Sequence, residues 1–97
     1  MWVLHTSAGT DGDATVFRVT DGATKTIGRA APADFVVDEA LMSRVHCRLS
    51  ATGGELVVED LESTNGTFVN GRRIDRALLV AGDRLRLGRV EFDISRG

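Results

Sequence analysis

Three short clusters of polar residues in this sequence carry groups that suit the binding of an anion. They are Gly28-Arg29, Ser43-Arg44-Val45-His46 and Ser63-Thr64-Asn65-Gly66-Thr67. An arginine guanidinium grips phosphate or carboxylate through paired hydrogen bonds, and a hydroxyl beside it adds a further donor. All three clusters fall in predicted turns between strands, where a rigid scaffold commonly displays its binding groups. Anion binding is therefore the first chemistry to consider.

Two of these clusters also have a purely structural interpretation. Glycine at position 28 is expected to let the backbone turn sharply, so that Arg29 projects outward as an anion ligand or as an ordinary surface arginine. Asn65 and Asn70 are the only asparagines, and each precedes a glycine, which predicts two tight turns. Turns alone leave the hydroxyls beside Asn65 unexplained.

Ser43 and His46 raise the question of catalysis, with the serine as nucleophile and the histidine as base. No acidic residue is placed to orient the histidine, and the Gly-x-Ser-x-Gly turn of many serine hydrolases is absent. We therefore expect His46 to lie on the polar face of the following strand and to hold the loop by hydrogen bonds. The sequence does not predict an enzyme.

The elements that must position these clusters are short strands separated by glycines, which predicts an all-β sandwich or barrel. Hairpins are expected at Asn70-Gly71 and Gly88-Arg89, and only Asp38–Met42 offers room for a helical turn. The predicted strands are Trp2–His5, Ala14–Thr20, Lys25–Gly28, Phe35–Val37, a run with Val45, Cys47 and Leu49 on one face, Leu56–Leu61, Thr67–Val69, Arg72–Ile74, Arg84–Leu87 and Val90–Ile94.

Composition narrows the class of protein further. The chain has 97 residues, which is the length of one domain, and its formal net charge of −2 argues against a dedicated nucleic-acid binder. No apolar run approaches the ~20 residues that cross a bilayer, and no signal-peptide pattern opens the chain, so a cytoplasmic protein is expected.

Cys47 is the only cysteine, and the two histidines are well separated, so no disulfide, metal or other cofactor is expected. Lys25 is the sole lysine among 12 basic residues, as is typical of a GC-rich bacterial genome.

In order and spacing, the clusters resemble the forkhead-associated (FHA) domain. The likeness extends from Trp2 to Ile94 and implies that residues 1–97 form a single FHA domain. It also implies an FHA-type β-sandwich of about eleven short strands with the binding loops at one end. The motifs that carry it are Gly28-Arg29, Ser43-x-x-His46, Val58-x-Asp60-Leu61, Asn65-Gly66-Thr67-x-x-Asn70-Gly71 and Leu79-x-x-Gly82-Asp83-x-Leu85-x-Leu87-Gly88.

The same resemblance implies a role for each site residue. A phosphate would be contacted by the Arg29 guanidinium and by the hydroxyls of Ser43 and Thr64, with Arg44 adding a contact. Asn65 would hold the peptide backbone on either side of the phosphothreonine. The residues expected to shape the loops without touching the ligand are Gly28, His46, Gly66, Asn70 and Gly71.

The implied function is a phosphothreonine-dependent protein-binding module that recognises an extended phosphopeptide on a signalling partner. That partner would be a phosphothreonine-containing protein, either a Ser/Thr kinase or its substrate, with no nucleic acid and no membrane insertion involved. An FHA fold used for phosphate-independent docking or dimerisation is the alternative. Leu41 gives no sign of an acidic preference in the peptide, whereas the nearby arginines would favour acidic flanks: Arg44, Arg72, Arg73 and Arg76.

Overall fold

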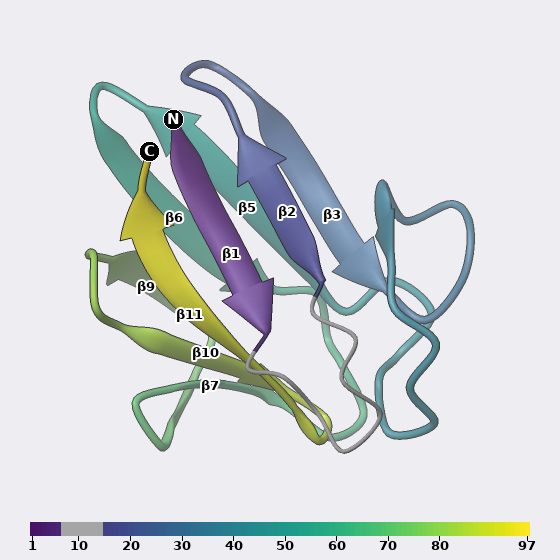
Figure 1. Ribbon diagram of the computed structural model, residues 1–97. Helices are drawn as coiled ribbons and strands as arrows, with labels where there is room; N and C mark the ends of the chain where they lie inside the picture. The colour runs from purple at the N-terminus through teal and green to yellow at the C-terminus, as the bar shows by residue number, and fades with distance from the viewer. Residues whose placement is uncertain (7–14) are drawn as a thin grey trace.

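The computed structural model describes residues 1–6 and 15–97, and within these ranges it contains strands and turns but no helix (Figure 1). The prediction of an all-β fold with about eleven strands is confirmed. The strands are β1 Trp2–Thr6, β2 Val16–Val19, β3 Thr24–Gly28, β4 Phe35–Val36, β5 Cys47–Thr52, β6 Glu55–Asp60, β7 Thr67–Val69, β8 Arg72–Ile74, β9 Arg76–Leu79, β10 Arg84–Leu87 and β11 Val90–Arg96.

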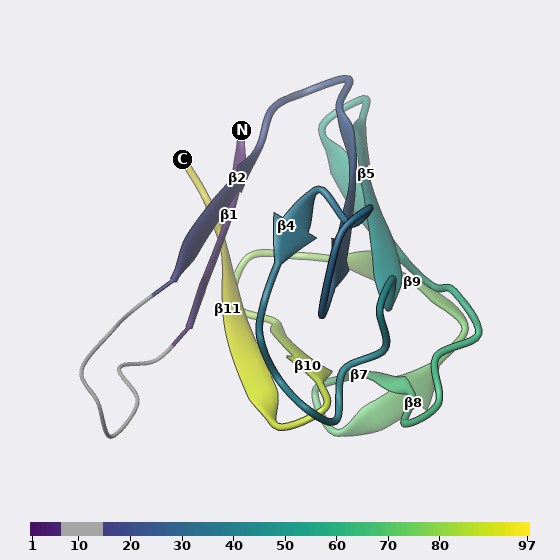
Figure 2. The same cartoon turned by 90° about the vertical axis from the view of Figure 1, so that its right-hand side faces the viewer.

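Two sheets pack face to face as a sandwich. One sheet has six strands in the order β2-β1-β11-β10-β7-β8, and the other has five in the order β4-β3-β5-β6-β9. Figure 2 separates the layers, with β1, β2 and β11 on the left and β5 and β9 on the right. Every strand pair recorded is antiparallel except β3 with β4.

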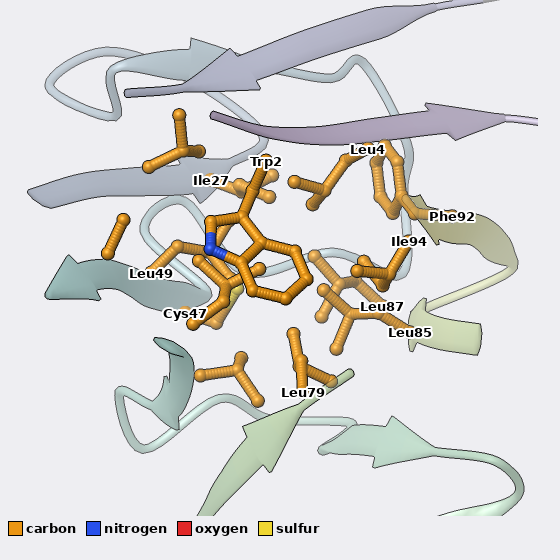
Figure 3. Packing of buried hydrophobic residues seen from close by; sticks show 14 of the residues in the cluster. Trp2, Leu4, Ile27, Cys47, Leu49, Leu79, Leu85, Leu87, Phe92 and Ile94 are labelled. Carbon is orange, nitrogen blue, oxygen red and sulfur yellow. The ribbon is translucent and has the colours of Figure 1, made fainter. Parts of the chain in front are cut away.

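The core lies between the sheets and is built from alternate residues of the strands, since successive side chains of a strand point to opposite faces. Trp2 is 3 % exposed and lies within this buried cluster (Figure 3). Phe17 of β2 stacks on Phe35 of β4 with ring centroids 4.3 Å apart, which closes the edge between the two sheets. Cys47 is fully buried and belongs to the core; burial raises the pKa of its thiol, so it is no nucleophile.

Some strand boundaries differ from those predicted. β9 is not predicted at all, because Asp75 alone separates it from β8 and no glycine or proline marks the turn. The predicted strand Ala14–Thr20 begins at a residue outside the described ranges, and β2 occupies its later part. In Asp38–Met42 there is one turn, closed by the Met42 N–H donating to the Glu39 carbonyl at 3.0 Å, and no helix.

The loops β3–β4, β4–β5 and β6–β7 meet at the end of the sandwich remote from both chain termini (Figure 1). Backbone hydrogen bonds join the first two loops, since the Arg29 N–H donates to the Ser43 carbonyl at 2.9 Å and the Ala30 N–H to the Arg44 carbonyl at 3.3 Å. The three polar clusters of the sequence are therefore neighbours in space.

Candidate functional site

An open hollow of about 440 Å³ lies among these loops. All the residues predicted to contact a phosphopeptide line it, although they come from three separate loops. Its walls are formed by Arg29, Ala40, Leu41, Met42, Ser43, Arg44, Val45, Thr64 and Asn65.

Arg29 is oriented by a hydrogen bond from its own side chain. The Nε–H donates to the carbonyl oxygen of Met42 at 3.1 Å. Met42 is 2 % exposed, so its buried side chain anchors the loop that carries this carbonyl. The two Nη groups of Arg29 make no hydrogen bond within the described residues, and they remain available to an anion in the hollow.

Gly28 is required for a different reason from the one its sequence suggests. The chain bends at Arg29 and Ala30 directly after it, but the φ of Gly28 is not positive, so this bend does not need the left-handed backbone that glycine allows. A β-carbon at this position would lie 2.0 Å from the Arg44 carbonyl oxygen, which is far inside van der Waals contact. Only glycine therefore lets the β4–β5 loop approach the end of β3 and bring Ser43 beside Arg29.

Ser43 connects two loops through its hydroxyl. The Oγ accepts a hydrogen bond from the Thr64 N–H at 3.0 Å. Because the oxygen acts as acceptor in this contact, the hydroxyl proton is still available for donation. Thr64 is exposed, and its hydroxyl has no hydrogen-bond partner within the described part of the chain.

His46 is fully buried, so the prediction that it lies on the polar face of the next strand is wrong. It precedes β5, and its ring bridges two loops. Nδ1 accepts the Ser43 N–H at 3.0 Å, which places the ring proton on Nε2, and Nε2 donates to the Gly66 carbonyl at 2.8 Å. Burial costs little here because both ring nitrogens are satisfied.

Asp60 organises the β6–β7 loop, a role that the sequence interpretation missed. Its Oδ1 accepts hydrogen bonds from the Ser63 hydroxyl and from the Thr67 hydroxyl at 2.7 Å. The Ser63 Oγ in turn accepts the Gly66 N–H at 3.0 Å. The hydroxyls of Ser63 and Thr67 are thus bonded to Asp60, and of the three hydroxyls on this loop only that of Thr64 is available in the hollow. An aspartate followed three residues later by a serine, whose N–H and hydroxyl can both bond the carboxylate, is the signal that would have identified this anchor.

The carboxylate of Asp60 is held in its charged form. Burial on its own would raise its pKa, but the hydrogen bonds from the Ser63 hydroxyl, the Thr67 hydroxyl and the Ser63 N–H outweigh this effect. The pKa of Asp60 therefore lies below its ordinary value. A charged acceptor strengthens both hydroxyl contacts.

Asn65 is exposed at the rim of the hollow. One hydrogen of its side-chain amide is used, since Nδ2 donates to the Leu41 carbonyl at 2.8 Å. The amide oxygen and the second Nδ2 hydrogen have no partner within the described residues. The contact therefore fixes the side chain but leaves it one acceptor and one donor.

Asn70 and Gly71 are not part of this cluster. They form the β7–β8 turn with φ values of 51° and 83°, which confirms the predicted hairpin, at the end of β7 opposite Gly66. Asn70 Nδ2 donates to Asp83 Oδ1 at 2.9 Å, and Asn70 Oδ1 accepts the Arg84 N–H at 3.0 Å. These bonds join the hairpin to the start of β10 and do not reach the hollow.

Glu39 supports the β4–β5 loop from outside the hollow. The Leu41 N–H donates to its Oε1 at 3.0 Å and holds the pKa of the carboxyl below its ordinary value; burial opposes this shift, and Arg89 adds to it. The Arg89 Nε lies 3.2 Å from the same oxygen. Glu39 is therefore occupied, and it does not neutralise Arg29 or Arg44.

A model of the FHA domain family matches residues 25–88. The chain belongs to the FHA domain family. It is 38 % identical over 72 residues to the glycogen accumulation regulator GarA of Mycolicibacterium smegmatis, covering 74 % of this chain and 46 % of GarA. It thus spans less than half of the length of this curated relative.

Solved FHA domains share the whole fold. The FhaA FHA domain, in complex with the intracellular domain of Rv3910, superposes with a TM-score of 0.87 at 30 % identity, over 98 % of this chain and 100 % of that one. A domain from a structural and functional analysis of phosphothreonine-dependent FHA interactions superposes with a TM-score of 0.84 at 31 % identity, over 99 % and 96 % of the two chains. The FHA-type sandwich predicted from the sequence is confirmed.

Ser43 and His46 of this FHA domain do not form a nucleophile–base pair. Both ring nitrogens of His46 bond to backbone groups, and neither is directed to the Ser43 hydroxyl. This geometry argues against the catalytic interpretation of these two residues. Within residues 1–6 and 15–97 there is also no helix of the length and apolarity that a membrane span requires.

Proposed function

We propose that this FHA domain binds phosphothreonine in an extended segment of a partner protein. The observation that carries the proposal is the convergence of the Arg29 guanidinium with the hydroxyls of Ser43 and Thr64 on one hollow. These residues are distant in sequence and lie together only because the loops are bonded to each other.

The available donors suit a phosphate group. A phosphothreonine carries a charge of about −1.5 to −2 at neutral pH and three acceptor oxygens. Arg29 offers its two Nη groups, and Ser43 and Thr64 each offer one hydroxyl proton. Arg44, which also lines the hollow, adds a second positive charge. Hydrogen bonds to a charged group contribute about 1.5–3 kcal/mol each, so these few contacts suffice for a useful affinity.

Asn65 suits the peptide chain rather than the phosphate. An extended backbone offers N–H and C=O groups at regular spacing, and the Asn65 amide has one acceptor and one donor left. We assign to it the peptide backbone next to the phosphothreonine. Gly28, His46 and Gly66 act indirectly, by holding the loops that carry the ligand-binding groups.

The partner class follows from the chemistry. Phosphothreonine is made by Ser/Thr kinases, so the partner we propose is such a kinase or one of its substrates, in the cytoplasm of a bacterium. The FhaA complex with the intracellular domain of Rv3910 is an example of a protein partner for a related domain. We further propose that residues 1–97 form a single FHA domain.

Binding of matched peptides tests the proposal. A fluorescent threonine peptide is prepared with and without phosphate, and its affinity for the wild-type domain is measured by anisotropy. We expect saturable binding of the phosphorylated peptide and none of the unphosphorylated one. Equal binding of the two, or of a partner before and after phosphatase treatment, would instead support phosphate-independent docking.

A further inference from the structure

Several arginines near the loops do not take part in the phosphate contacts, and the structure separates them by position. Arg76 of β9 is paired in register with Glu59 of β6, on the five-stranded sheet. Arg72 is paired with Val69 beside the Asn70-Gly71 turn, at the end of the hairpin away from the hollow. Neither lines the hollow.

Arg73 is placed differently, because its side chain packs against the β6–β7 loop. A β-carbon on Gly66 would lie 2.8 Å from Arg73 Nε and 3.1 Å from Cζ, so the guanidinium covers the α-carbon of Gly66. Gly66 directly follows Thr64 and Asn65, which line the hollow. A positive charge therefore stands immediately beyond the wall formed by these two residues.

Arg44 is its counterpart on the other wall. It is exposed, lies on the β4–β5 loop and lines the hollow. The two arginines thus flank the proposed phosphothreonine position, one beside each of the loops that hold it.

Neither charge is neutralised within the described residues. Arg48, Arg84 and Arg89 all have a carboxylate within 4 Å, whereas Arg44 and Arg73 have none. Glu39, on the same loop as Arg44, is engaged by Arg89. Unneutralised positive charge on both sides of an anion site attracts further negative charge and disfavours basic partners.

We propose that the peptide segment around the phosphothreonine is acidic, with Arg73 reading a carboxylate on the flank that crosses the β6–β7 loop. Arg44, whose charge also lies at the phosphate hollow, contacts a carboxylate on the opposite flank. Residues of an extended peptide are about 3.3 Å apart, so a carboxylate a few positions from the phosphothreonine comes within reach of each side chain. This specificity rests on the proposed phosphothreonine binding.

The test is a glutamate scan of a short phosphothreonine peptide whose other residues are alanine. We expect glutamate at one or more positions on each flank to lower Kd about two- to fivefold, the range of an exposed ion pair. The gain should shrink at high salt, because exposed charges are screened. Arg73→Glu should abolish or reverse the gain on one flank only. Arg44→Gln should remove the gain on the other flank, measured as the ratio of Kd for the alanine and glutamate peptides, because the charge of Arg44 also lies at the hollow and its loss weakens binding of every phosphopeptide.

Arg72→Glu is the matched control, since it makes the same charge change one residue away and should leave both gains intact. Arg73→Gln removes the charge without reversing it, and thermal melts establish that each variant is folded. Equal affinity of the wild-type domain for the alanine and glutamate phosphopeptides, or a gain that survives Arg73→Glu and Arg44→Gln, overturns the acidic preference but not phosphothreonine binding. Failure of every phosphopeptide to bind the wild-type domain overturns both.

Discussion

Arg29 and Ser43 each divide their polar groups between the loops and the ligand. Arg29 uses Nε on the Met42 carbonyl and keeps both Nη groups, while Ser43 accepts the Thr64 N–H and keeps its proton. The hydrogen bond to the neighbouring loop orients the side chain, so the remaining Nη groups and hydroxyl proton lose little conformational freedom when a ligand binds. Preorganisation of this kind raises affinity by lowering the entropic cost of association.

Replacement of Arg29 should therefore be the most damaging single change. Arg29→Ala removes a charge and at least two charge-assisted hydrogen bonds, and we expect Kd for a phosphothreonine peptide to rise about a hundredfold or more. Arg29→Lys keeps the charge but not the planar fork, so it should recover only part of the loss. Ser43→Ala should rank next, with a rise of about tenfold. Anisotropy titrations give these values, and a wild-type affinity in Arg29→Ala would contradict the assignment.

At the scale of the loops, buried and partly buried hydrogen bonds form a continuous series from Asp60 to the hollow. Asp60 holds Ser63, Ser63 holds the Gly66 N–H, and the Gly66 carbonyl accepts His46 Nε2. His46 then holds the Ser43 N–H. The β4–β5 and β6–β7 loops are thus fixed relative to each other before any ligand arrives.

Asp60→Asn tests this series through stability. The substitution weakens two hydroxyl contacts to a charged acceptor, and we expect the free energy of unfolding to fall by about 1–2 kcal/mol in urea denaturation at neutral pH. Asp38→Asn is the control, because Asp38 is an exposed carboxylate with no hydrogen bond in the described residues. Equal stability of Asp60→Asn and the wild type would mean that Asp60 does not hold the β6–β7 loop.

The same carboxylate should make stability depend on pH. The pKa of Asp60 is lower in the folded than in the unfolded state, so the unfolded chain binds more protons between the two values. Its stabilising contribution is then complete above the unfolded pKa of about 3.9 and is lost as the pH falls through the folded value. Over this acidic range the Asp60→Asn variant should lose less stability than the wild type. Parallel pH curves for the two proteins would refute the linkage.

Gly28→Ala tests the close approach of β3 and the β4–β5 loop. The methyl group would collide with the Arg44 carbonyl, and we expect a loss of about 1–3 kcal/mol from overpacking together with weaker phosphopeptide binding. Gly53→Ala is the comparison, because nothing lies within 4 Å of its β-carbon and only its positive φ opposes the change. A binding affinity unaffected by Gly28→Ala would mean that this contact does not position the site.

Across the whole molecule, local patterns in the sequence predict most of the strands but not the contacts between loops. Alternation of apolar residues identifies β5, β10 and β11, and Asn70-Gly71 identifies the β7–β8 hairpin, because both signals act over a few residues. The strand β9 escapes prediction because its pairing with β6 defines it, and because no glycine or proline marks a turn between β8 and β9.

The residue types of the candidate site could likewise be predicted from the sequence, whereas the contacts that hold them in place could not. The residue types of Arg29, Ser43 and Thr64 suggest an anion site, and the family resemblance groups them. The burial of His46, however, depends on a carbonyl twenty residues away, which no local pattern contains. Likewise, the need for Gly28 arises from Arg44 across the loop and not from its own backbone angle. Contacts of this long range appear only once the sheets are assembled.

The most direct measurement is a titration of the ¹⁵N-labelled domain with a phosphothreonine peptide, followed by amide chemical shifts. We expect the largest shifts in residues 28–30, 41–46 and 63–66, and we expect the unphosphorylated peptide to leave these residues unchanged. Shifts centred elsewhere, such as on the exposed β9 edge around Leu78 and Val80, would contradict this expectation.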